Sequence, residues 1–366
     1  MSKEYTALGL MSGTSMDGVD ASIIQSDGEK KYKVILDKYF EYPQNIYENL
    51  TKLRDKIRSF NDLKEFSKEL KKSEREITLF HGEAVNQILR KTKANVDFLG
   101  FHGQTIYHSP TERVSKQLAD GKLLSKITKK TVLYDFREND LKNGGEGAPL
   151  TPIFHKLLVK QNKIKLPVTI LNIGGIANIT SINDNYEIVS QDIGPGNCLI
   201  DTWIRLKSNK KYDDEGLIAR SGKFGELFVK SIIESYLKSP LSKKKSFNTN
   251  DFVDFISKNT VSADLSLEDF VCTITEITAK IISLKIKNKN IYVCGGGRKN
   301  KYLIERIEKK IKHKIKLIDR FGVNGDFVES QAFAYLAIRS FLKLPISFPG
   351  TTGVEKPCAG GRKIEF

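Results

Sequence analysis

Three short stretches of this 366-residue sequence have the glycine and small polar residues that suit a phosphate-binding loop. Phosphates are held by backbone N–H groups, and glycine leaves those groups uncovered by side chains. Each loop taken alone has an ordinary tight turn as its alternative, and none carries the lysine of a Walker A motif. The loops comprise Gly13, Thr14, Ser15, Met16, Asp17, Gly18, Val19 and Asp20; then Asn172, Gly174 and Gly175; then Gly295, Gly296 and Gly297.

Carboxylates stand beside these loops. Asp17 and Asp20 belong to the first loop, and Asp192 opens the sequence Asp-Ile-Gly-Pro-Gly-Asn. A carboxylate after a strand and before a glycine–proline turn can point into a cleft. There it can act as a general base or hold Mg²⁺ through water. The alternative for Asp192 is a turn-forming residue or a helix cap.

Two polar residues follow a short apolar run and lie two positions apart. His102 and Gln104 share one face of any extended segment, as donors to a ligand would. A core histidine with a backbone partner is the alternative for His102. The spacing therefore indicates, but does not by itself establish, a substrate-facing pair.

Asp135, Arg137 and Glu329 complete the candidate set. Arg137 follows a predicted strand over 131–134 and is a candidate to bind a substrate carboxylate. An internal salt bridge is its alternative. Glu329 stands three residues after Asp326, which is also the spacing of a capping box at a helix start.

The elements that must position these residues follow a repeated pattern. An apolar run, a glycine-bearing turn and a second apolar run predict a hairpin. The pattern occurs twice, each time with a third strand, and so predicts two related halves. Helical spacing of apolar residues predicts the helices between them. The predicted strands are 5–11, 19–25, 32–40, 96–101, 131–134, 168–173, 176–182 and 186–191, and the helices are 63–93, 267–286, 300–312 and 325–342.

Length and composition indicate a folded protein of two domains. Hydrophobic residues make up 39% of the chain and charged residues 28%, which argues against disorder. The net charge of +16 is spread thinly and fits a solvated lysine surface, with anionic partners as the alternative. The four cysteines form no CxxC pair, which indicates reduced thiols. No apolar stretch predicts a signal peptide or membrane helix, and the lysine-rich segment 238–250 is expected to be an exposed, mobile loop.

The ordered set of motifs is similar to that of the anhydro-N-acetylmuramic acid kinases. The similarity covers nearly the whole chain, and it is the order of the motifs that makes it specific. The motifs are MSGTSMDGVD from Met11, HGQT from His102, DFR from Asp135, GAPL from Gly147, NIGG from Asn172, DIGPGN from Asp192, GGG from Gly295 and PGTTG from Pro349.

The resemblance implies an α/β fold with two actin-like (ribonuclease H-like) ATPase domains around a central cleft. Domain I would span 1–140 with 341–366, and domain II 141–340. The cofactors would be ATP and Mg²⁺, with the metal near Asp17 and Asp20 and the catalytic base at Asp192. The other nucleotide-binding residues would be those of the three loops with Gly194, Gly196 and Asn197, and the sugar would meet His102, Gln104, Asp135, Arg137 and Glu329.

The activity implied is ATP-dependent opening of the anhydro ring of 1,6-anhydro-N-acetylmuramic acid by water with phosphorylation at O6, in cell-wall sugar recycling. Such a protein is expected to be cytoplasmic and homodimeric, without nucleic-acid or membrane partners. An ordinary sugar kinase of the same fold, and a nucleotide-gated actin-like or chaperone-like protein, are the alternatives. A nucleic-acid binder would rest on charge alone.

Two places depart from the family pattern. Phe101 stands where a serine usually precedes His-Gly-Gln. Residues 246–250 read Ser-Phe-Asn-Thr-Asn where the family often has Ser-Thr-Gly-Arg-Glu. The second departure removes an arginine, which leaves the role of that segment open.

Overall fold

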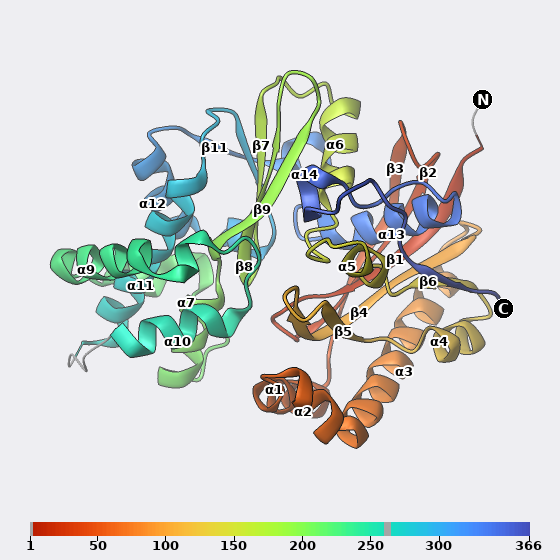
Figure 1. The fold of residues 1–366 in the computed structure, drawn as a ribbon, viewed down its shortest axis with the longest axis horizontal. Coiled ribbons are helices and arrows are strands. Elements are labelled where there is room, and N and C mark those ends of the chain that lie inside the picture. The colour runs from red at the N-terminus through yellow and green to blue at the C-terminus, as the bar shows by residue number, and fades with distance from the viewer. Residues whose placement is uncertain (1–2, 260–264) are drawn as a thin grey trace. The chain divides into compact units, whose positions relative to one another are not determined.

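The computed structural model describes residues 3–259 and 265–366 and divides into two compact units. Unit 1 combines the chain up to Ile164 with Phe327–Phe366, and unit 2 is Lys165–Asp326. Figure 1 labels the elements of both units. The boundaries between the two units thus lie after residues 164 and 326. The domain boundaries predicted from the sequence lie after residues 140 and 340.

Unit 1 is built on a seven-stranded mixed sheet in the order β12-β6-β4-β1-β2-β3, with β5 pairing to β4. Strands β1, β2 and β3 form an antiparallel meander, and β4 and β6 run parallel to β1. The strands are β1 (Tyr5–Ser12), β2 (Gly18–Ser26), β3 (Tyr32–Glu41), β4 (Phe98–Ser109), β5 (Val114–Leu118), β6 (Thr131–Tyr134) and β12 (Arg362–Ile364).

Unit 2 has a five-stranded sheet in the order β11-β10-β7-β8-β9. Here β7, β8 and β9 form the antiparallel meander, and β10 and β11 run parallel to β7. The strands are β7 (Val168–Ile173), β8 (Ile176–Ile182), β9 (Ile188–Pro195), β10 (Ile291–Cys294) and β11 (Ile315–Leu317).

Both sheets therefore share one strand order: a meander of three strands and then two strands parallel to the first. This is the strand order of the ribonuclease H-like fold. The predicted α/β class and the predicted duplication of the hairpin pattern are confirmed. Because β1 and β4, and likewise β7 and β10, are parallel neighbours, loops after their carboxyl ends lie together at one edge of each sheet.

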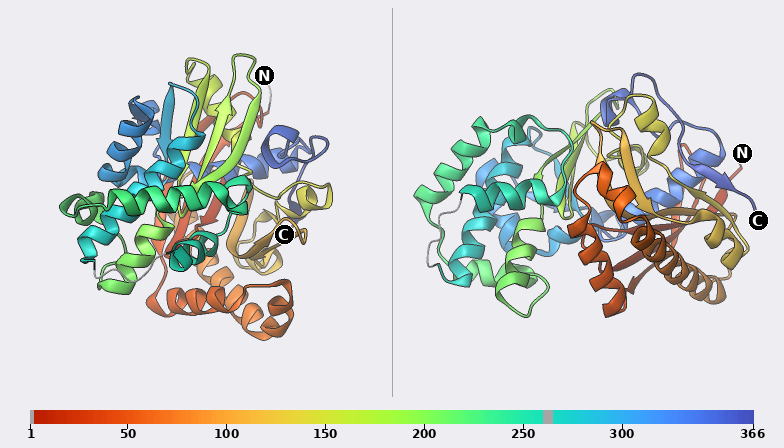
Figure 2. Two further views of the ribbon diagram at one scale, coloured as in Figure 1. Left: turned by 60° about the vertical axis from the view of Figure 1, so that its left-hand side comes forward. Right: turned by 60° about the horizontal axis from the view of Figure 1, so that its bottom comes forward.

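Helices cover the sheets of both units (Figure 2). In unit 1, α13 packs closely on β1 and β4 because glycines lie beneath it. A Cβ on Gly9 would lie 2.0 Å from the Ser330 carbonyl, and one on Gly100 would lie 2.3 Å from that of Phe333. The unit 1 helices are α1 (Gln44–Lys56), α2 (Phe60–Glu65), α3 (Ser67–Lys91), α4 (Gly121–Thr128), α5 (Glu138–Lys142), α6 (Pro152–Gln161), α13 (Val328–Phe341) and α14 (Pro349–Thr352).

In unit 2, α11 is the central helix, and most of its residues are buried against α7, α8, α9, α12 and the sheet. The helices of this unit are α7 (Cys198–Lys207), α8 (Leu217–Ser221), α9 (Glu226–Lys238), α10 (Thr249–Asn259), α11 (Leu267–Lys285) and α12 (Lys301–Ile311). Short 3₁₀ turns occur at Asp214–Gly216, Pro240–Lys243, Gly296–Lys299 and Ile318–Phe321. Within the described ranges no helix has the length and apolar character needed to span a membrane.

Several predicted elements differ from those observed. The strand expected over 96–101 begins at Phe98 and continues to Ser109, so His102 and Gln104 lie within it and do not follow it. The helix expected over 63–93 is broken at Phe66 into α2 and α3. The strand expected to end at 191 continues as β9 to Pro195 and includes Asp192. The prediction that the whole segment 238–250 is exposed was wrong, because Ser246 and Phe247 are each only 8% exposed.

Candidate functional site

The first glycine loop joins β1 to β2 and is fixed from the protein interior. Met16 has a positive φ of 59° and is only 2% exposed, so its side chain holds the loop to the unit 1 core. The Met16 N–H donates to the Gly13 carbonyl (3.2 Å), and the Tyr42 N–H donates to the Asp17 carbonyl (2.8 Å). A Cβ on Gly13 would have only the Ser15 hydroxyl within 4 Å, so this side of the loop can approach a phosphate closely.

Gln104 connects the neighbouring strand β4 to this loop. Its amide Nε2 donates to the Gly13 carbonyl at 2.9 Å, and the side chain is completely buried. Its Oε1 has no hydrogen-bond partner within residues 3–259 and 265–366. A buried acceptor without a partner is costly, so a donor supplied by a ligand would satisfy it.

A buried network of side-chain hydrogen bonds, which was not predicted from the sequence, lies beneath the first loop. His81 on α3 pairs through Nδ1 with the Ile77 carbonyl (2.8 Å) and through Nε2 with the Ser12 hydroxyl (3.1 Å). The Ser12 hydroxyl also contacts the Tyr42 hydroxyl at 2.8 Å. Burial lowers the pKa of His81 to about 4, so the imidazole is neutral. No local sequence signal could have found these contacts, because the residues lie far apart in the chain.

His102, within β4, and Arg137, which precedes α5, are brought together. The Arg137 Nε and Nη2 lie 3.3 and 3.0 Å from His102 Nε2, and Nη1 donates to the Gly147 carbonyl at 3.1 Å. His102 Nδ1 contacts the Gly103 carbonyl at 2.8 Å. Burial, and then the charge of Arg137, holds the pKa of His102 well below its usual range. Each ring nitrogen of His102 thus has a partner in the protein: Nδ1 has the Gly103 carbonyl, and Nε2 has the Arg137 guanidinium.

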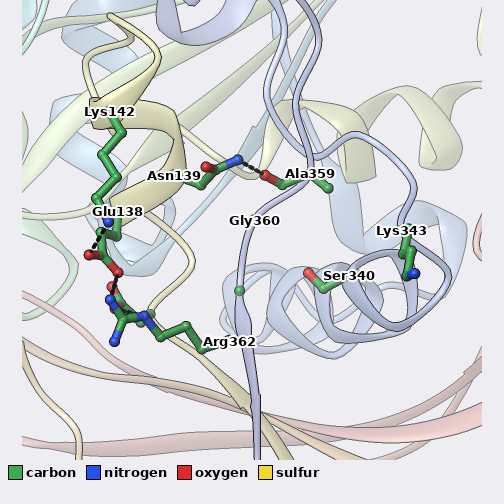
Figure 3. Close-up of a pocket in the computed structure, with 10 residues that line it drawn as sticks. Glu138, Asn139, Lys142, Ser340, Lys343, Ala359, Gly360 and Arg362 are labelled. Carbon is green, nitrogen blue, oxygen red and sulfur yellow. Dashed lines mark hydrogen bonds and ion pairs between the residues drawn. The ribbon is translucent and has the colours of Figure 1, made fainter.

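Asp135 lines a cavity of about 370 Å³, and other residues that line it are labelled in Figure 3. It has a positive φ of 57°, and its Oδ2 lies 3.2 Å from Arg362 Nε of β12. Arg362 also pairs with Glu138, which pairs with Lys142 at 2.6 Å. Burial, followed by the contact with Glu138, raises the pKa of Asp135 to about 6. The cavity is lined by Asp135, Glu138, Asn139, Lys142, Ser340, Lys343, Ala359, Gly360, Gly361 and Arg362.

Glu329 lies in the first turn of α13, at residues 328–341. The capping box considered for Asp326 and Glu329 is not formed. The N-cap residue is Phe327, without a side-chain hydrogen bond, and Asp326 is paired with Arg298.

The second glycine loop and the Asp-Ile-Gly-Pro-Gly-Asn motif form one structure. The N–H groups of Gly196 and Asn197 donate to the carbonyls of Gly175 and Gly174, at 2.9 and 2.8 Å. A Cβ on Gly196 would lie 2.2 Å from the Gly174 carbonyl, so only glycine fits there. Asn197 is the N-cap residue of α7, whose N-terminal end favours negative charge.

The third glycine loop packs directly on the second. A Cβ on Gly295 would lie 2.4 Å from the Asn172 Oδ1, and one on Gly297 would lie 2.2 Å from the Ile173 Cγ2. Gly296 has open space on its Cβ side. Gly295 and Gly297 are thus required by packing, whereas Gly296 leaves room for a ligand.

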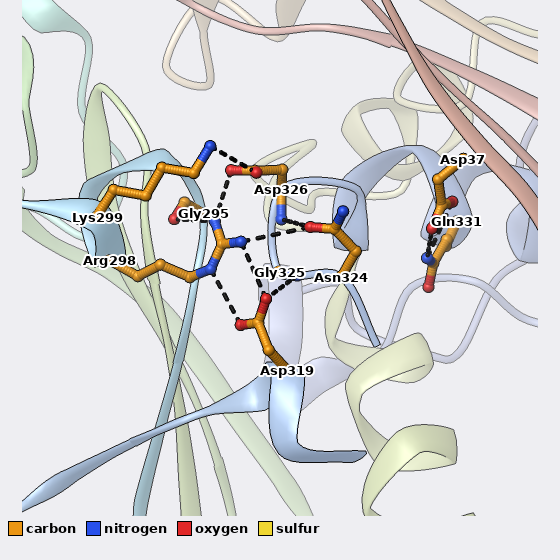
Figure 4. Close-up of polar contacts among 9 residues, drawn as sticks. All are labelled: Asp37, Gly295, Arg298, Lys299, Asp319, Asn324, Gly325, Asp326 and Gln331. Carbon is orange, nitrogen blue, oxygen red and sulfur yellow. Dashed lines mark hydrogen bonds and ion pairs between the residues drawn. The ribbon is translucent and has the colours of Figure 1, made fainter. Parts of the chain in front are cut away.

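Arg298 fixes the third loop to the segment before α13 (Figure 4). Its Nε and Nη2 each lie 3.0 Å from Asp319, and its Nη1 lies 2.5 Å from Asp326 and 3.2 Å from the Gly295 carbonyl. Burial opposes ionisation of both carboxyls, but the hydrogen bonds from Arg298 hold their pKa values below the usual range. Arg298 was not among the predicted site residues, although it directly follows the glycines.

Asp192 lies on β9, opposite Asn178 of β8, beside a bulge that shifts the register between Ala177 and Asn178. Its N–H donates to the Lys245 carbonyl at 3.0 Å, and its Oδ2 accepts from the Phe247 N–H at 3.0 Å. Asp192 is therefore a strand residue, and the N-cap of α7, the next helix along the chain, is Asn197. A bulge at this position redirects side chains and is common beside active sites.

The carboxylates proposed for the metal lie at the first loop. Asp17 accepts a hydrogen bond from the Ser15 hydroxyl at 2.6 Å, and Asp20 is on β2. The described residues contain no group of three or more His, Cys, Asp or Glu side chains that could hold a metal ion. One or two carboxylates suit Mg²⁺ when nucleotide phosphates and water supply the remaining ligands.

The two sheets and their glycine loops define an α/β protein of the ribonuclease H-like fold. The family model for anhydro-N-acetylmuramic acid kinase matches residues 5–364, and this chain belongs to that family. The relative from Pelagibacter ubique (strain HTCC1062), named anhydro-N-acetylmuramic acid kinase, is 52% identical, with 99% of this chain and 98% of the relative covered. The relative of the same name from Agrobacterium fabrum is 35% identical, with 99% of both chains covered.

Among solved structures, the activator of the 2-hydroxyisocaproyl-CoA dehydratase from Clostridium difficile with bound ADPNP is 13% identical to this chain. The match has a TM-score of 0.43 and covers 91% of this chain and 94% of the activator.

Proposed function

We propose that this protein uses ATP and water to convert 1,6-anhydro-N-acetylmuramic acid to N-acetylmuramic acid 6-phosphate. The observation that carries the proposal is the family match over residues 5–364, within which every motif of the candidate site falls. In the reaction the C1–O6 bond breaks, a water oxygen bonds to C1, and O6 takes the γ-phosphoryl group of ATP. ADP leaves.

Asp192 is proposed as the general base. A carboxylate next to C1 takes a proton from the attacking water as O6 departs. Positioned general bases contribute about 10² to 10⁴ in rate. The hydrogen bond from the Phe247 N–H to Asp192 Oδ2 supports this role, because it holds the carboxylate in one orientation.

ATP is proposed to meet the three glycine loops at the sides where the structure has open space. Those sides are at Gly13, Gly174 and Gly296; a Cβ on Gly174 would have only the Ile176 carbonyl within 4 Å, at 3.5 Å. Asp17 and Asp20 would hold Mg²⁺ together with the phosphates, and the ion would neutralise charge on the transferring group.

The muramic acid carboxylate is proposed to bind Arg137, whose guanidinium His102 orients. Gln104 Oε1, buried without a partner in the described part of the chain, would accept from a hydroxyl or amide of the sugar. Asp135 and Glu329 remain further candidates for sugar contact. The Asp135 carboxylate is paired with Arg362, whose Nε lies 3.2 Å from Oδ2.

The domain bounds 1–140 with 341–366 and 141–340, the homodimer and the cytoplasmic location remain predictions. Size-exclusion chromatography with light scattering tests the dimer. An ordinary sugar kinase of the same fold is the second candidate, but no observation favours it over the family match.

The deciding experiment is the product mass after incubation with ATP, Mg²⁺ and 1,6-anhydro-N-acetylmuramic acid. A product heavier than the sugar by one phosphoryl group and one water is expected. In H₂¹⁸O the label should enter at C1. A phosphorylated product that still contains the anhydro ring, or no product, would contradict the proposal.

A further inference from the structure

Residues 245–248 run along β9 at Asp192. Strand β9 is at the edge of the unit 2 sheet, so one side of it has no neighbouring strand. At Asp192 that edge is covered: the Asp192 N–H donates to the Lys245 carbonyl, and the Phe247 N–H donates to Asp192 Oδ2, both at 3.0 Å. The segment therefore holds both the backbone and the carboxylate of Asp192.

The start of α10 anchors this segment by reciprocal hydrogen bonds. Asn248 Oδ1 accepts from the Asp251 N–H at 3.0 Å, and Asp251 Oδ2 accepts from the Asn248 N–H at 2.9 Å. This is the arrangement of a capping box, with Asn248 as N-cap and Asp251 at N3. Lys244 adds an ion pair to Asp251 at 2.7 Å.

An aromatic contact completes the anchor. Phe247, which precedes the cap, packs on Phe252 with ring centroids 4.9 Å apart, and both rings belong to the unit 2 core. A pair of apolar residues at N′ and N4 is a hydrophobic staple, which fixes the direction in which the chain enters a helix. The residue whose N–H contacts Asp192 is therefore the one whose ring is fixed in the core.

We propose that Phe247 and Asn248 are positioning residues for the catalytic carboxylate. The capping box and the staple set the place of the Phe247 N–H, and this N–H sets the orientation of Asp192. The proposal rests on the role given to Asp192 above. It also assigns a function to residues 246–250, where the chain departs from the family pattern. Small displacements of a base from its productive position cost large factors in rate, so such support is required.

The first experiment compares two helix caps within unit 2. Asn248→Ala removes the cap beside Asp192. Ser266→Ala removes the N-cap of α11, where Ser266 accepts from the Asp269 N–H at 3.1 Å, and serves as the matched control. Both variants should lose a few degrees of melting temperature. Only Asn248→Ala should lower kcat, by about 10-fold, with KM for ATP and for the sugar unchanged.

Two further variants complete the test: a conservative replacement of Asn248, and a double variant with Asp192→Asn. Asn248→Asp, which keeps a capping acceptor, should restore kcat. In an Asp192→Asn background, Asn248→Ala should cause no further loss, because both changes act on one group. Product formation by the unaltered protein with equal kcat in both cap variants would overturn this proposal alone. Absence of product from the unaltered protein would overturn the proposed reaction and this proposal with it.

Discussion

The guanidinium of Arg137 contacts Nε2 of His102 through two of its nitrogens, at 3.3 and 3.0 Å. This nitrogen must be an acceptor, because arginine can only donate. The proton therefore resides on Nδ1, where it is donated to the Gly103 carbonyl. The neutral ring thus orients the Arg137 guanidinium without adding a second positive charge, and the sugar-binding role proposed for His102 is exerted through Arg137.

Replacing His102 should therefore weaken sugar binding and leave ATP binding unchanged. His102→Phe keeps an aromatic ring against Phe333 but removes the acceptor for Arg137. Hydrogen bonds to charged groups contribute about 1.5 to 3 kcal/mol. We expect KM for the sugar to rise roughly 10- to 100-fold, measured by steady-state kinetics with each substrate varied in turn.

The matched control is His155→Phe, the same exchange at a fully buried histidine of α6 in unit 1. It should lower thermal stability and leave both KM values within about twofold. Equal KM changes in the two variants, or a change for ATP alone, would contradict the link between His102 and Arg137.

Asp192→Asn should lower turnover by roughly 10³-fold while ATP still binds. The amide retains an oxygen that can accept from the Phe247 N–H, so the local fold is expected to persist. ATP affinity is measured by calorimetry and turnover by product formation. Asp201→Asn, at a carboxylate in the first turn of α7, is the control and should be near normal. Near-normal turnover in Asp192→Asn would exclude its role as base.

Local patterns predicted most of the elements that carry the site. Strands β6, β7 and β8 have the predicted bounds, because each is a short apolar run ended by a turn residue or glycine. The end of β9 was not found, since Asp192-Ile193-Gly194 resembles a turn in sequence. There the ladder to β8 and a bulge, which are non-local, outweigh turn propensity.

Contacts between residues far apart in the chain could not be predicted from local sequence patterns. His81 and Ser12 are 69 residues apart, and Arg298 and Asp326 are 28 apart. Residues 247–252 did carry a local signal, an asparagine three residues before an aspartate, between two phenylalanines. The lysines that precede it favoured an exposed loop, and the capping pattern was missed.

Buried histidines should make the protein less stable at acid pH. Burial lowers the pKa values of His81 and His155 to about 4, against about 6.5 in the unfolded chain. Between these values the unfolded chain binds more protons, so stability falls as pH falls from about 6.5 towards 4. Each histidine should cost on the order of 1 to 2 kcal/mol at pH 5.

Urea unfolding at pH 7.5, 6 and 5 measures this loss. His155→Phe should flatten the pH dependence, because it removes one of the groups whose pKa burial lowers. Asp135 acts in the opposite direction, because its raised pKa of about 6 favours the folded state as pH falls below that value. A stability that rises steadily from pH 6.5 to 5 would contradict the prediction for the histidines.

Arg298 should control ATP binding through the third glycine loop. The bidentate contact with Asp319 and the bond to Asp326 depend on the planar fork of arginine, which lysine cannot reproduce. Arg298→Lys is therefore expected to raise KM for ATP about 10-fold with KM for the sugar unchanged. Arg306→Lys, at the buried ion pair with Glu276, disturbs a comparable contact between α11 and α12. If both variants lose only thermal stability and keep the same KM for ATP, Arg298 serves the fold of unit 2 and not the nucleotide.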